Sequence, residues 1–133
     1  MKITLLSDER IRLDGRAGPM TIEAESAETT YSPFHMLASS LATCTLSVLH
    51  SWATNAKVPA DDLAIEVGWT FAEDPHRVGT MEVDLQWPSL PENRRAAAQR
   101  VAELCTVKVT LKHPPEVTTA VRGAEAPAPA GAA

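Results

Sequence analysis

Apolar and polar residues alternate at every second position in two long segments, a pattern typical of half-buried β-strands. The alternation is clearest over 63–71 and returns over 81–87, and Asp74-Pro75 between these segments predicts a turn. Weaker alternation predicts four further short strands, at 2–7, 10–14, 20–24 and 117–121.

Two other segments follow the helical period. The first begins at Ser32, a good N-cap residue, with Pro33 at the first helical position, and it runs towards Asn55. The second begins at Ser89, which fits a capping box with Glu92, and runs to about residue 104. The pattern therefore predicts an α+β protein in the order β-β-β-α-β-β-α-β.

The first helix has an unusual composition, because the 28 residues 29–56 contain no Asp, Glu, Lys or Arg. Its many Ser and Thr residues make it too polar for a membrane span. A surface helix carries a charged face, so this long central helix is expected to be buried on most of its sides. An apolar stripe lies on one side of it, at Leu37, Leu41, Cys44, Val48 and Trp52. Six short strands and one other helix are too few to enclose it, so we expect an intertwined homodimer.

The 133 residues, of which 44% are hydrophobic and 22% charged, suit one soluble domain, expected over 1–122. Residues 123–133 contain little but Ala, Pro and Gly and are expected to be a flexible tail. The net charge of −5 and the lack of a basic run argue against nucleic acid as a partner. No signal peptide or membrane segment is recognisable at the beginning of the chain, so we expect a cytoplasmic protein that does not bind membranes.

Two cysteines are the candidate chemistry. Cys44 lies in the middle of the first helix, and Cys105 follows 61 positions later at the end of the second. Taken alone, each fits plain core packing as well as it fits a reactive thiol. His35 fits either a surface position at the helix start or a polar group of a site. Because no His/Cys set has zinc spacing, no metal is predicted.

The segment from Ser32-Pro33 through Leu-Ala-rich turns to Cys44 resembles the helix signature of the OsmC/Ohr family, the osmotically inducible protein C-like and organic hydroperoxide resistance-like proteins. The segment 102–111, with Cys105, and the following Pro115-Glu-Val-Thr are similar to that family's second cysteine segment and closing strand. The resemblance covers about residues 2–122. Residues 107–111 fit a strand or a helix equally well, and the family places a short helix there.

The resemblance implies thiol-dependent reduction of organic hydroperoxides at the interface of a dimer. Cys44 would be the peroxidatic thiol, which attacks the peroxide and becomes a sulfenic acid. Cys105 would be the resolving thiol, which closes a disulfide that an external dithiol, for example of the lipoyl type, then reduces. No cofactor is implied. Phe34, Leu41 and Val48 are the candidate substrate-binding residues.

A desolvated thiol becomes reactive only when a nearby positive charge favours its thiolate. Arg16 is the first candidate for this cation, ahead of Arg12 and Arg10, with His35 as an alternative. Family members commonly carry a glutamate one or two residues after the helix-opening proline, where this chain has Phe34 and His35.

Two functions therefore remain open. The retention of both cysteines favours a peroxidase of the OsmC type. The absence of the glutamate favours a dimer of the same fold that binds an apolar small molecule without peroxide chemistry.

Overall fold

The computed structural model describes residues 2–5, 11–14 and 32–124. Contacts within the chain group them into two units, one comprising 1–25 with 116–133 and the other comprising 26–115. In the first unit, β1 (Lys2–Leu5) pairs antiparallel with β2 (Ile11–Asp14), as the alternation predicts. The strand expected at 20–24 and the tail residues 125–133 lie outside the described residues.

The second unit is built on the long helix α1 (Pro33–Ala56). Ser32 is its N-cap and Pro33 opens it, so the predicted beginning is confirmed. The N-cap is a reciprocal one in which the Ser32 Oγ accepts from the His35 N–H at 3.2 Å and the Ser32 N–H donates to the His35 ring at 3.3 Å. The helix ends at Lys57, whose left-handed backbone lets its N–H reach the last carbonyls.

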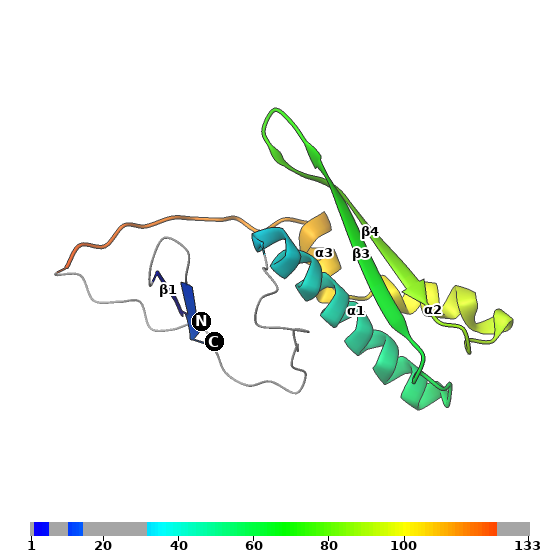
Figure 1. Ribbon diagram of the computed structural model, residues 1–133. Helices are drawn as coiled ribbons and strands as arrows, with labels where there is room; N and C mark the ends of the chain where they lie inside the picture. Colours follow the sequence, from blue (N-terminus) through cyan, green and yellow to red (C-terminus); the bar gives the residue numbers. More distant parts are fainter. Residues whose placement is uncertain (1, 6–10, 15–31, 125–133) are drawn as a thin grey trace. The chain divides into compact units, whose positions relative to one another are not determined.

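The two strongest strand predictions are also confirmed. β3 (Ala64–Ala72) and β4 (Arg77–Gln86) form an antiparallel hairpin that runs along α1 (Figure 1). The apolar residues at every second position lie on the face towards the helices and are half-buried, except Phe71, which is 44% exposed. The turn between the strands contains Asp74-Pro75, as expected.

The second predicted helix is shorter than expected and begins differently. A single 3-10 turn, η1 (Glu92–Arg94), leads into α2 (Arg95–Ala102). The capping box predicted at Ser89 is wrong, because η1 has Pro91 as its N-cap and no side-chain cap hydrogen bond, and the Ser89 hydroxyl donates to the Asp62 carboxylate at 2.6 Å. A carboxylate accepts a stronger hydrogen bond than backbone partners offer, and it draws Ser89 to the start of the hairpin.

The C-terminal order also differs from the prediction. Residues 106–112 form α3 (Thr106–Lys112), the helical alternative. The strand expected at 117–121 is wrong, because residues 116–124 form neither helix nor strand and Val121 is 96% exposed. A strand needs a hydrogen-bonded neighbour, and among the described strands β1 pairs only with β2 and β3 only with β4.

The core lies where α1, the ends of the hairpin and α2 meet. Leu49 and Ala53 of α1 pack with Trp87, Ala98 and Ala102. The Trp87 indole N–H donates to the Pro59 carbonyl at 2.9 Å, so its polar atom is satisfied. The hairpin, α2 and α3 together cover one side of α1, which holds Ala38, Leu41, Thr45, Leu49 and Ala53. Leu41 belongs to the expected stripe, and each of the other four buried residues follows a stripe residue by one position.

Candidate functional site: two thiols between helices

Two free cysteines meet where α1 contacts the segment between α2 and α3. Cys44 is half-buried in the middle of α1. Cys105 follows α2, is the N-cap residue of α3, and has no exposed surface (0%). The partly accessible thiol and the fully buried one therefore come from segments far apart in the sequence.

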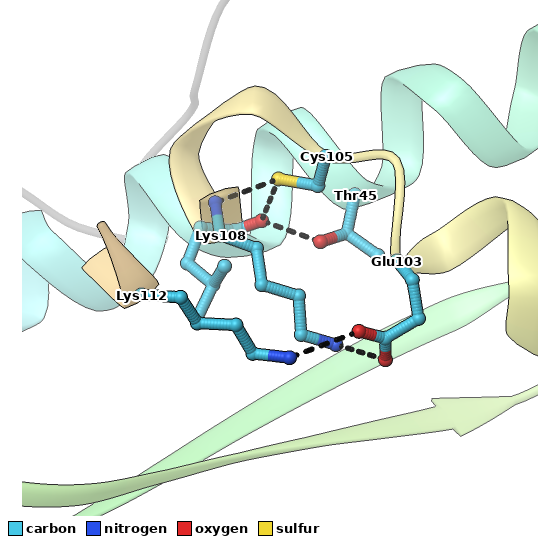
Figure 2. A network of polar contacts seen from close by, with 6 residues as sticks. Thr45, Glu103, Cys105, Lys108 and Lys112 are labelled. Carbon is cyan, nitrogen blue, oxygen red and sulfur yellow. Dashed lines mark hydrogen bonds and ion pairs between the residues drawn. The ribbon is translucent and has the colours of Figure 1, made fainter. Parts of the chain in front are cut away.

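The Cys105 sulfur makes two polar contacts, and the oxygen of one of them also accepts from Thr45 (Figure 2). The Lys108 backbone N–H donates to it at 3.4 Å. The thiol donates to the Leu41 carbonyl of α1 at 3.9 Å. The Thr45 hydroxyl donates to the same carbonyl at 2.8 Å. Thr45 and Cys105 therefore converge on one backbone oxygen inside the protein.

Burial raises the pKa of Cys105, but hydrogen bonds outweigh it and leave the pKa of this thiol below its ordinary value. The largest of these is the hydrogen bond with the Cys44 side chain. The Lys108 backbone N–H, the Thr45 hydroxyl and the Val107 backbone N–H add to it. Cys44 and Cys105, 61 positions apart in the sequence, are thus neighbours in the fold, and the pKa of Cys105 is lowered.

A cluster of charges lies beside the thiols (Figure 2). The Glu103 carboxylate pairs with the Lys108 ammonium at 2.6 Å and with the Lys112 ammonium at 3.2 Å. Hydrogen bonds from these two lysines lower the pKa of Glu103. One carboxylate pairs with two ammonium groups, so this cluster carries a net charge of +1. Lys108 joins it to the thiol site, since its backbone holds the Cys105 sulfur while its side chain holds Glu103.

Two grooves follow the helix-facing side of β4. A groove of about 450 Å³ lies between α1, β4 and α3, with Leu37, Leu41, Met81 and Leu111 among its apolar walls and Lys108 and Lys112 at its edge. A second groove of about 590 Å³ lies between β4 and α2. Val83 and Lys108 line both grooves. The smaller groove borders the thiol site through Leu41, whose carbonyl contacts Cys105.

The model of the OsmC-like protein family matches residues 25–120, which include α1, the hairpin, both cysteines and α3. The chain belongs to the OsmC-like family. Its structure is similar to the crystal structure of a protein from Psychrobacter arcticus 273-4, described as an osmotic stress induced and detoxification response protein, with a TM-score of 0.57 and 25% identity. The similarity covers 63% of this chain and 62% of that one, so this chain spans about three fifths of its relative's length. No curated protein matches the sequence.

Of the three predicted substrate-binding residues of this OsmC-like chain, one lines a groove and two do not. Leu41 lines the smaller groove beside the thiols. Val48 is half-buried on α1, and Phe34 packs edge-on against Phe71 with ring centroids 4.9 Å apart; neither lines the two grooves.

Of the candidate cations, His35 is the one that the structure describes in the same unit as the thiols, and it lies away from them. His35 caps α1 and lies edge-on to Trp69, nine residues before Cys44, which corresponds to about 13 Å along the helix axis. Arg16 and Arg10 lie outside the described residues, and Arg12 is in β2 of the other unit. Their roles stay predictions.

Sequence reasoning missed Thr45 and the charge cluster of Glu103, Lys108 and Lys112. A signal for Thr45 exists, since it is four residues after Leu41 and so shares its helix face. The cluster depends on α3 being a helix, which the sequence left open. Among the described residues no group of three His, Cys, Asp or Glu side chains gathers as metal ligands, and no helix is long and apolar enough to cross a membrane.

Proposed function

We propose that this OsmC-like protein reduces organic hydroperoxides with Cys44 and Cys105. The observation that supports it most is that Cys105, the N-cap of α3, contacts α1 at the Leu41 carbonyl and has Cys44 of the same helix as a neighbour. A dithiol pair of this kind can pass from thiolate to sulfenic acid to disulfide without a large rearrangement.

The burial of each thiol supports the division of roles. Cys44 is partly accessible and takes the peroxide, whereas Cys105 has no exposed surface and acts only on its neighbour. The Cys44 thiolate attacks the distal peroxide oxygen, and the O–O bond breaks. The leaving alkoxide takes up one proton and becomes an alcohol. Cys105 then attacks the resulting sulfenic acid, and an external dithiol, for which a lipoyl group is one candidate, reduces the disulfide.

The substrate is expected to be apolar, because the groove beside the thiols has apolar walls. A second copy of the chain completes the site in this proposal, since His35, the candidate cation in the same unit as the thiols, lies at the N-terminal end of α1, away from Cys44. Arg16, Arg12, Arg10 or His35 of the partner chain are the candidates that would favour its thiolate.

The test is consumption of cumene hydroperoxide with excess dithiol. Cys44→Ser should abolish turnover. Cys105→Ser, given peroxide without dithiol, should consume one equivalent and remain a sulfenic acid, which a dimedone adduct on Cys44 would report. The exposed Asn93→Ala on the 3-10 turn η1 serves as the control and should turn over normally. Wild-type protein that consumes no peroxide would overturn the proposal.

The grooves favour a second candidate, a protein that binds an apolar molecule without peroxide chemistry. The charge of +1 beside the apolar walls suits a ligand with an anionic end. On this candidate, calorimetry should show dodecanoate binding more tightly than dodecanol, and Lys112→Gln should weaken dodecanoate alone. The exposed Lys57→Gln is the matched control. Equal binding of acid and alcohol would contradict it.

A further inference from the structure

Thr45 is a polar residue in a part of the protein that is otherwise apolar, and it is only 1% exposed. Its hydroxyl donates to the Leu41 carbonyl at 2.8 Å, the oxygen that the Cys105 thiol also approaches at 3.9 Å (Figure 2). We propose that the Thr45 hydroxyl moves from the Leu41 carbonyl to the Cys105 sulfur when that thiol ionises, and so holds the resolving thiolate. This inference rests on the proposed function and adds a residue to it.

The number of hydrogen-bond donors that the Cys105 sulfur needs explains the movement of the Thr45 hydroxyl. In the thiol state, the Thr45 hydroxyl and the Cys105 thiol both point to the Leu41 carbonyl. Ionisation removes the thiol proton and leaves a sulfur that can only accept. A buried anion without donors is costly, and water does not reach a residue with no exposed surface. The Lys108 N–H supplies one donor, and a rotation about the Thr45 side chain supplies the next.

The charged groups around Cys105 do not replace this donor. The whole of α1 carries no Asp, Glu, Lys or Arg and its histidines, His35 and His50, are exposed, so from that side the titratable neighbour is Cys44. Glu103 lies before α3, and Lys108 and Lys112 lie in it. Both ammonium groups pair with the Glu103 carboxylate. The lowered pKa of Cys105, to which the Thr45 hydroxyl contributes, agrees with stabilisation by hydrogen bonds.

The step that Thr45 would assist balances as follows. The Cys105 thiolate attacks the sulfur of the Cys44 sulfenic acid, the S–S bond forms and the S–O bond breaks. The leaving hydroxide takes up a proton and becomes water, and the electron pair of the thiolate becomes the new S–S bond. Because the hydroxyl increases the thiolate fraction of Cys105, removing it should slow disulfide closure and leave the attack on peroxide unchanged.

The first experiment measures the ionisation of Cys105 in a Cys44→Ser background, where it is the one remaining thiol. Ultraviolet absorbance of the thiolate is followed against pH. Thr45→Val, which keeps the shape and removes the hydroxyl, should shift the midpoint upwards by about one unit, as expected when one hydrogen bond to a charged group is lost. Thr45→Ser should restore it. Thr45→Ala provides a second variant without a hydroxyl if the valine disturbs folding, which circular dichroism checks.

The matched control is Thr54→Val. Thr54 donates to the His50 carbonyl at 2.9 Å, which is the same bond four residues back along α1, but at an exposed position. It should leave the titration of Cys105 unchanged. An unshifted midpoint in Thr45→Val and Thr45→Ala, or an equal shift in Thr54→Val, would overturn the inference.

The second experiment is single-turnover kinetics with both cysteines present. Thr45→Val should slow disulfide closure about tenfold below the midpoint pH, since the thiolate fraction falls tenfold per pKa unit, and the loss should shrink at higher pH. A merely structural role would slow closure equally at every pH. The absorbance titration needs no peroxide, so the two proposals can fail separately. A shifted midpoint without peroxidase activity refutes the proposed function and keeps the Thr45 assignment. Peroxidase activity without a shifted midpoint keeps the proposed function and refutes the Thr45 assignment.

Discussion

Single polar residues fix the two ends of the hairpin to one another. Asp62 precedes β3, and its carboxylate accepts from the Ser89 hydroxyl at 2.6 Å and from the Ser89 N–H at 2.7 Å. These hydrogen bonds lower the pKa of Asp62 below its ordinary 3.8, led by the one from the hydroxyl. The charged form of Asp62 therefore stabilises the folded protein.

Asp62→Asn should lower the melting temperature by a few degrees at neutral pH. A carboxyl with a lowered folded-state pKa contributes stability that is present above its unfolded pKa and is lost as the pH falls through the folded pKa. The difference between wild type and Asp62→Asn should therefore be constant near neutral pH and shrink below pH 3.8, the ordinary value. Thermal unfolding followed by circular dichroism against pH measures it. The exposed neighbour Asp61→Asn is the control and should show a smaller effect.

At the residue scale, the sequence predicted the two cysteines of the candidate site. Cys44 and Cys105 were identifiable because a thiol pair with helix signatures around it is specific. Thr45 and Asp62 were not, because each acts through a partner far along the chain or through a shared carbonyl. The resemblance to a family supplies positions for its own motif, and it is silent on residues that only this chain's packing brings together.

At the scale of elements, the β3–β4 hairpin contains an irregular point. Thr70 pairs with Thr80, but the next residue, Phe71, pairs with Val78, so Gly79 has no partner across the hairpin. A single extra residue on one strand is a β-bulge, which bends the strand and increases its twist. A Cβ at Gly79 would lie 2.8 Å from the Ala72 Cβ, so only glycine fits without a shift.

Gly79→Ala should lower the free energy of unfolding by about 1–3 kcal/mol, the usual effect of overpacking. Gly68→Ala, on β3 of the same hairpin, has open space around the added methyl group and should be neutral or stabilise by about 0.5–1 kcal/mol. Urea unfolding of the two variants checks this. Equal destabilisation by both would show that the loss in Gly79→Ala does not come from the contact with Ala72.

The elements divide into those with a strong local pattern and those decided by partners. Residues 63–71 and 81–87 alternate cleanly and form the hairpin, and the helix from Ser32 has its cap and its first proline in sequence. The segment 117–121 alternates as well, yet it has no pairing strand among those described. The capping box at Ser89 failed for a similar reason, because Asp62, distant in sequence, competes for its hydroxyl.

At the scale of the whole molecule, one chain leaves surfaces that suit a partner. The side of α1 away from the hairpin exposes uncharged residues, including Ser40, Ser47, His50, Ser51 and Thr54. On and beside α3, Leu104 is 68% exposed and Val109 47%. Exposed apolar side chains and an uncharged helix face are both features of interaction surfaces. The homodimer proposed from the sequence would cover this face of α1 with a second copy.

A charge on this face should therefore separate the dimer. Light scattering of the wild type at micromolar concentration should give twice the chain mass of 14.3 kDa. Ser47→Lys should give the mass of a single chain, because a buried ammonium without a partner costs several kcal/mol, which is enough to break an association of moderate strength. Asn93→Lys, at an exposed position of the 3-10 turn η1, adds the same charge away from α1 and should remain dimeric. Circular dichroism must show that both variants keep the wild-type helix content. A monomeric wild type, or a Ser47→Lys variant that stays dimeric, would mean that the uncharged face of α1 is not the dimer interface.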